Sequence, residues 1–182
     1  MKTLAMVLLL VTASAAEGKH ISESSMGGDL RVPSAPDGAT LRTMGGDITV
    51  GSAQGHVTAK TMGGDIEVRQ LAGSIEAGTM GGNVEIAVTR ADGNIVVTSM
   101  GGHIELTLPA NFSGTFDLQL EQDDDGPRNE IISDFPLKFQ ERKQDNWFRP
   151  DTTLVEATGT AGSGTNAVKI KTIGGDIRIR RK

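Results

Sequence analysis

The sequence predicts an all-β protein built as a parallel β-solenoid, or β-helix, with coils of about 18 residues and an aromatic-rich insertion or cap. Three observations lead to this prediction. A Met-Gly-Gly motif recurs at a nearly constant interval, apolar and polar residues alternate on both sides of it, and glycine recurs in the bends. Together they indicate short strands with one buried face, joined by tight corners.

The repeat is centred on the sequence TMGGDI and its variants. The first four methionines of the motif follow one another at steps of 18 residues, the fifth follows after 20, and a last copy, TIGGDIRI, starts at Thr172. The positions that define this structural repeat are Met26, Met44, Met62, Met80, Met100, Gly45, Gly46, Gly63, Gly64, Gly81, Gly82, Gly174 and Gly175.

Each copy is flanked by two segments that alternate with period two, as strands with one buried face do. Val57, Ala59 and Thr61 precede one Gly-Gly pair, and Ile66 and Val68 follow it. In a coil of constant period, equivalent residues of successive copies stack about 4.8 Å apart, so the aliphatic columns form a continuous core. An antiparallel β-sandwich is the alternative fold, but it gives no reason for identical corner residues at a fixed period.

The methionines form one column of the predicted coil. Soft-metal or hydrophobic binding is one interpretation of this column. We expect instead that the methionines fill gaps at a corner, because Ile173 replaces methionine in the last copy and could not serve as a thioether ligand. The Ser or Thr before each methionine is expected to bond backbone groups of the bend.

The first residues have the order of a secretory signal peptide, with Lys2, a short apolar run and small residues up to Ala16. The apolar run is too short to span a bilayer, and we expect no transmembrane segment in the mature chain. The expected location is therefore a periplasm, the cell surface or the extracellular space. The expected boundaries are a signal peptide at 1–16 and one solenoid domain at 17–182, with repeats at 25–108 and 165–182 and an irregular insertion or cap at 109–164.

All five phenylalanines and the single tryptophan fall within the interval 109–164. An open solenoid end exposes unpaired strand edges that need covering, so we expect this segment to be a packed cap or side flap. A ligand groove is the alternative, and Trp147 and Phe148 are its candidate binding residues.

The composition excludes several classes of protein. The chain has no cysteine, so it can form neither a disulfide nor a thiolate metal site. Its formal charge of −5 and its 3% aromatic content argue against nucleic-acid binding. No cofactor is expected.

Stacking would place Asp29, Asp47 and Asp65 in one column, and these are the candidate metal ligands. Calcium-binding β-rolls also have 18-residue coils, but their GGxGxDxUx repeat supplies more ligands than one GGD per coil. Asn83 and His103 also interrupt the acidic series. We therefore expect no metal site, and predict a local Asx hydrogen bond at each strand start.

A carbohydrate-active β-helix enzyme is the remaining alternative. Glu67 and Glu85 could be drawn as an acid pair, but a regular column of outward glutamates is typical of a solvated face. The three histidines, His20, His56 and His103, stand in unrelated settings, and Ser163 lacks the flanking glycines of a nucleophile elbow. We predict no catalytic residues.

Several segments resemble the bacterial domains of unknown function that are labelled as adhesins. They are the GGDI strands, LPANFSGTFDL at 108–118, SDFP at 133–136 and GTNAVKIKTIGGDIRIR at 164–180. The resemblance covers nearly all of the expected mature chain, implies a β-solenoid and supplies no catalytic residue. We therefore expect a non-catalytic envelope or surface protein, structural or adhesion-like, whose partner is an envelope or surface protein or a polysaccharide.

Overall fold

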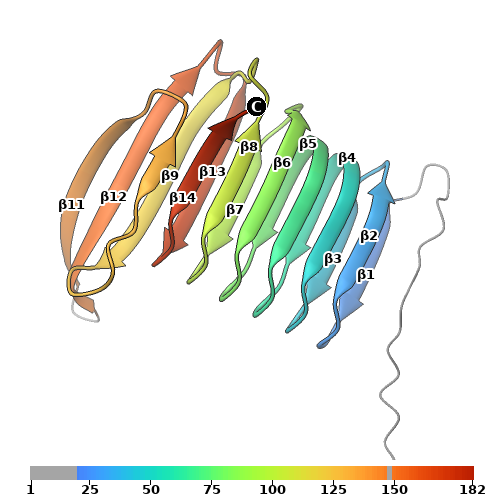
Figure 1. Ribbon diagram of the computed structural model, residues 1–182, viewed down its shortest axis with the longest axis horizontal. Coiled ribbons are helices and arrows are strands. Elements are labelled where there is room, and N and C mark those ends of the chain that lie inside the picture. The colour runs from blue at the N-terminus through green and yellow to red at the C-terminus, as the bar shows by residue number, and fades with distance from the viewer. Residues whose placement is uncertain (1–19, 147–148) are drawn as a thin grey trace, which may run out of the picture.

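The computed structural model describes residues 20–146 and 149–182. In these residues the chain forms strands and no helix, which confirms the all-β prediction (Figure 1). Fourteen strands join into one continuous sheet that curls back on itself, giving a solenoid-like stack with two faces. The described part therefore contains no helix that could cross a bilayer.

The strands that follow each Gly-Gly pair, and one further strand at the end of the row, form one face of the stack. In spatial order they are β2 (Leu30–Ala35), the first half of β4 (Ile48–Lys60), the first half of β5 (Ile66–Gly78), β6 (Val84–Arg90), β8 (Ile104–Leu108), β14 (Ile177–Arg181) and β10 (Ile131–Ser133).

The strands that precede each pair, and three further strands at the end of the row, form the opposite face. They are β1 (Ile21–Ser25), β3 (Ala39–Thr43), the second halves of β4 and β5, β7 (Ile95–Ser99), β13 (Asn166–Ile173), β9 (Gly114–Asp123), β12 (Arg149–Ala161) and β11 (Lys138–Asn146).

Pairing within the repeats is parallel. Ile48 pairs with Ile66 on one face, and Val57 pairs with Ile75 on the other. The residues of each pair are 18 positions apart, as are Asp29 and Asp47, and Asp47 and Asp65, which are hydrogen-bonded between corners. Antiparallel pairing is confined, among the described strands, to β12 with β9 and with β11. The antiparallel sandwich is therefore not the arrangement of the repeats.

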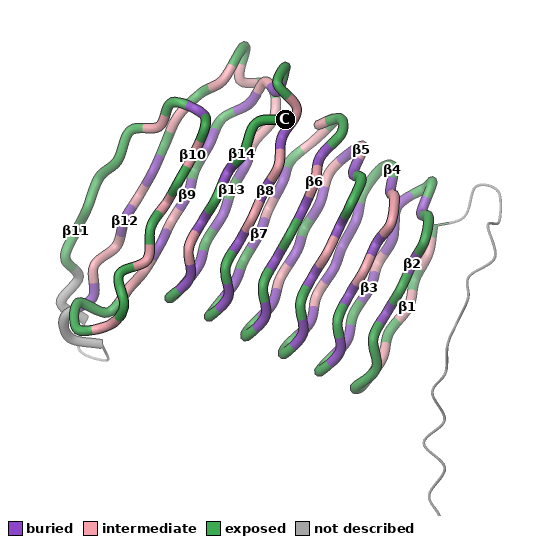
Figure 2. The backbone as a smooth tube through the Cα atoms, viewed as in Figure 1, coloured by how far each residue is buried: buried purple, intermediate pink, exposed green. Residues whose placement is uncertain are grey.

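The core lies between the two faces and follows the alternation of the sequence (Figure 2). Ile48, Ile66 and Leu71 are fully buried, whereas Glu67 between them is half-exposed. Each inward aliphatic side chain rests on the equivalent residue of the next coil. Burial of one such side chain contributes about 1.5–3 kcal/mol, which is why stacked coils are stable where a single coil would not be.

The interval 109–164 was expected to be irregular, but it forms strands. Its alternating residues Phe116, Leu118 and Leu120 are buried in β9, so β9 and β10 build a further coil. The antiparallel strands β11 and β12 then cover the end of the second face. Phe112, Phe116 and Phe135 pack together, with ring centroids 5.2–6.0 Å apart. These three phenylalanines therefore complete the core at this end, whereas Phe139 on β11 is 54% exposed.

The last repeat does not lie at the end of the stack. β13 pairs with both β7 and β9, and β14 pairs with both β8 and β10, so this coil is inserted between the fifth repeat and the coil of β9 and β10 (Figure 1). The inserted coil fits at this place because its corner makes the same backbone hydrogen bond as a consecutive repeat would. The N–H of Ile104 donates to the carbonyl of Asp176.

Candidate functional site: the methionine edge

The hydroxyl of Thr61 joins two adjacent coils at the corner. It accepts a hydrogen bond from the N–H of Gly64 at 3.2 Å and donates one to the carbonyl of Gly46 in the preceding coil at 3.0 Å. Thr43 and Thr79 make the same pair of bonds. The predicted role of this column in bonding the bend is confirmed. The last corner differs, because there the hydroxyl of Thr172 is buried without a hydrogen-bond partner.

The second glycine of each pair is required by the stacking of the corners. A Cβ atom added to Gly64 would lie 2.1 Å from the carbonyl oxygen of Gly46. Gly46, Gly82 and Gly102 meet equally close backbone atoms. The first glycine of the pair is different, since a Cβ atom on Gly63 would meet its nearest neighbour at 3.9 Å. Contact with the neighbouring coil therefore explains one glycine of the pair and leaves the other unexplained.

The aspartate column is held by bonds between coils. The Asp29 carboxylate accepts from the N–H of Asp47 at 3.0 Å, and the Asp47 carboxylate accepts from the N–H of Asp65 at 2.9 Å. The ladder continues through Asn83 and His103, whose Oδ1 and Nδ1 atoms accept in the same way. The predicted local Asx bond is therefore wrong, because the N–H from which each side chain accepts belongs to the next coil.

These bonds also explain why a column of carboxylates is tolerated. Each carboxylate in the series receives an N–H donor from its neighbour, and this hydrogen bond offsets like-charge repulsion. The described residues contain no group of three or more acidic or histidine side chains arranged to hold a metal ion. Asp29, Asp47 and Asp65 thus serve as acceptors between coils in this structure.

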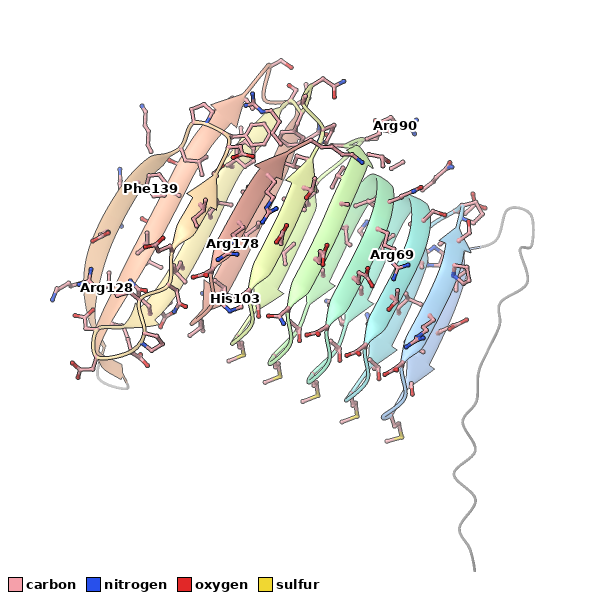
Figure 3. All side chains as sticks on the ribbon, in the orientation of Figure 1. Arg69, Arg90, His103, Arg128, Phe139 and Arg178 are labelled. Atoms are coloured by element: carbon pink, nitrogen blue, oxygen red, sulfur yellow. The ribbon has the colours of Figure 1, made fainter. Side chains whose placement is uncertain are left out.

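The methionine column is exposed, so the interpretation of these residues as corner packing is wrong. The side chain of Met26 is 86% exposed, and those of Met44, Met62, Met80 and Met100 are 47–53% exposed. Figure 3 shows the sulfur atoms in a row along one long edge of the stack. The corner turns outward at this position, because the threonine before it and the second glycine after it are held inward. We call these five residues the methionine edge.

A shallow groove of about 300 Å³ runs beside the methionine edge. Met62, Met80 and Met100 line it, together with Gly78, which contributes no side chain. Lys60 and Glu76 also line it, joined by an ion pair of 2.5 Å. The hydrogen bond from Lys60 lowers the pKa of Glu76, so the pair is charged at neutral pH and neutral overall. Sequence reasoning missed Lys60 and Glu76, because nothing in the repeat marks them.

The outward glutamates lie on the first face, away from the groove. Glu67 and Glu85 are neighbours on β5 and β6. Arg69 donates to Glu67 at 2.7 Å, and this hydrogen bond lowers the pKa of Glu67. A general acid in glycoside hydrolysis needs a raised pKa. The pKa of Glu67 is lowered instead, which argues against this role.

The remaining candidates are spread over the surface. His56 contacts Ser74 at 2.9 Å and Thr58 at 3.3 Å. Ser163 bonds Ser113 at 2.8 Å. His20 contacts Thr40 at 3.0 Å. No described contact joins any of these serines to both a histidine and a carboxylate. Trp147 and Phe148, and the expected signal peptide at 1–16, lie outside the described residues.

Comparison with known proteins places the chain in a family. The family model described as Toastrack DUF4097 matches residues 17–180, which is most of the sequence. No curated protein and no solved structure matches the chain. The strand-rich repeat described above fits this assignment, and the chain belongs to the Toastrack family DUF4097.

Proposed function

We propose that this chain is a non-catalytic protein of the cell envelope or cell surface, and that its methionine edge is a contact surface for another envelope component. In this proposal, the solenoid of about 18-residue coils acts as a rigid frame. It holds five flexible apolar side chains in a row, one per coil.

The exposure of the methionine edge is the observation that carries this proposal. Among the described residues, the large apolar side chains that are exposed are Met26, Met44, Met62, Met80 and Met100 on the repeats, and Ile132 and Phe139 outside them. Contiguous exposed apolar side chains mark contact surfaces more often than scattered ones do. Methionine suits such a surface because its unbranched side chain adapts to partners of different shape. An apolar edge favours a protein partner over a polysaccharide.

The location rests on the signal-like sequence of residues 1–16. Expression of the full chain with a C-terminal tag, followed by cell fractionation and mapping of the mature N-terminus, tests it. We expect a mature form that begins near Glu17 in the exported fraction. A full-length form in the cytosol would contradict the location.

The contact surface is tested by co-sedimentation of the purified protein with isolated envelopes. We expect a variant with Met44, Met62 and Met80 changed to serine to lose at least about tenfold in binding. The matched variant with leucine at the same positions keeps the apolar edge and should bind as the wild type does. Equal binding by the serine variant would rule out the methionine edge as the contact surface.

A further inference from the structure

The groove beside the methionine edge brings three thioethers together. Met62, Met80 and Met100 belong to consecutive coils and line the same open space of about 300 Å³. Their strands pair in parallel register, so the side chains start about 4.8 Å apart. Methionine has three rotatable bonds, so each of these sulfur atoms can take several positions beside this space.

The choice of methionine carries information beyond apolarity. An apolar contact could equally use leucine, isoleucine or valine, and the last repeat does use Ile173, which is half-buried. The five exposed corners use methionine alone. The chain has no cysteine, so thioether sulfur is its only soft ligand. Soft thioethers select Cu(I) over hard divalent cations such as Ca²⁺.

Spacing and charge both suit a monovalent cation. A first-row metal bonds sulfur at about 2.3 Å, and twice this distance, about 4.6 Å, is close to the rung spacing of a parallel sheet. Two sulfur atoms of adjacent coils therefore fit one ion at this spacing, and the third reaches it by rotation of its own side chain. The positive charge of Lys60 is balanced by Glu76, to which it is paired.

We propose that Met62, Met80 and Met100 bind one Cu(I) ion through their sulfur atoms. Ag(I) is the redox-inert probe for the same site. The inference rests on the proposed function in one respect, which is that the methionine edge is a solvent-facing binding surface. It differs in requiring sulfur, whereas the contact surface requires only an apolar edge.

The test is a titration of the purified protein with Ag(I) in chloride-free buffer, followed through the ¹³C-labelled methyl signals of methionine. We expect saturation at one equivalent, with shifts of the Met62, Met80 and Met100 methyl groups. Anaerobic competition with a coloured Cu(I) chelator should give the same stoichiometry. Ca²⁺ should leave these signals unchanged.

Two variants make the result decisive. The triple variant M62L/M80L/M100L keeps the shape and the apolar surface of the groove, and we expect its affinity for Ag(I) to fall at least about tenfold. The double variant M26L/M44L lies outside the groove and should bind as the wild type does. Unchanged Ag(I) binding by the triple variant, or no methyl shift in the wild type, overturns the inference.

Failure of this inference can be distinguished from failure of the proposed function. If the thioethers bind no metal but serine at Met44, Met62 and Met80 abolishes envelope binding, the contact surface stands and the metal site falls. If Ag(I) binds but the serine variant still sediments with envelopes, the metal site stands and the contact surface falls.

Discussion

The fold explains the residues on the inner side of each corner, but it does not explain those on the outer side. On the inner side, Thr61 bonds two coils, and Gly64 lies where any side chain would strike the carbonyl of Gly46. On the outer side, Met62 is half-exposed and Gly63 has room for a side chain. Both sides repeat with the same regularity, so regularity alone does not separate structural residues from functional ones. The contacts of each residue make this distinction.

The largest effect expected within a corner comes from the second glycine of the pair. Gly64→Ala should cost about 3 kcal/mol of unfolding free energy, because its Cβ atom would lie 2.1 Å from a backbone oxygen and the coils would have to separate. Gly63→Ala should change the unfolding free energy by less than about 1 kcal/mol. Equilibrium unfolding in urea measures both. Similar losses for the two variants would mean that the corner is packed differently from this structure.

The threonine column should give the next largest effect. Thr61→Val keeps the shape of the side chain but removes a donor and an acceptor, and should cost about 2 kcal/mol. Thr61→Ser keeps the hydroxyl and should cost less than about 1 kcal/mol, since Ser25 and Ser99 already hold equivalent places. Thermal unfolding followed by circular dichroism would rank the two. A serine variant as unstable as the valine variant would contradict the role of the hydroxyl.

The aspartate ladder should be tolerant of charge removal but sensitive to loss of its acceptor. Asp65→Asn keeps an Oδ1 atom for the N–H of Asn83 and should be nearly neutral. Asp65→Ala removes this atom and should cost about 1 kcal/mol. The comparison is made by urea unfolding with and without Ca²⁺, and we expect Ca²⁺ to have no effect. If Ca²⁺ stabilised the wild type and left Asp65→Asn unaffected, the column would be a cation site after all.

The smallest effect concerns the ion pair in the groove. The folded pKa of Glu76 lies below its unfolded value of 4.5, because Lys60 donates to it. Its contribution to stability is therefore present above pH 4.5 and is lost as the pH falls through the folded pKa. The pair is exposed, so the contribution should stay under about 1 kcal/mol. Unfolding at pH 5.5 and 3.5 should show a weaker pH dependence in Glu76→Gln. An identical dependence would show that the pair adds no stability.

Much of this fold could be predicted from the sequence, because the repeat reports contacts between equivalent residues. Alternation placed Ile48, Ile66 and Ile75 inside, and all three are buried. The hydroxyl column was also predicted correctly. Local rules failed where the partner is remote in sequence. The acceptor for the N–H of Asp47 lies 18 residues away, and the last repeat enters the stack between strands that are adjacent to it only in space.

The methionine edge could not be predicted for a different reason. Period-two alternation predicts which strand residues are buried, but a corner residue belongs to neither face of a strand. For Met44 and its equivalents, the apolar character of the side chain was therefore the only indication, and it suggested burial. Their exposure follows from the direction in which the corner turns, which depends on the inward bonds of Thr43 and Gly46. The half-buried Ile173 in the last corner made packing look like the simpler explanation.

The most direct test of the contrast between the two sides is the unfolding free energy of Met62→Ala set against that of Ile66→Ala in the same coil. The fold requires Ile66, which is 1% exposed, and this variant should lose about 2–5 kcal/mol. Met62 is 50% exposed, and its variant should lose no more than about 1 kcal/mol. Equal losses would show that the methionine edge is part of the structural core and not a surface left for binding.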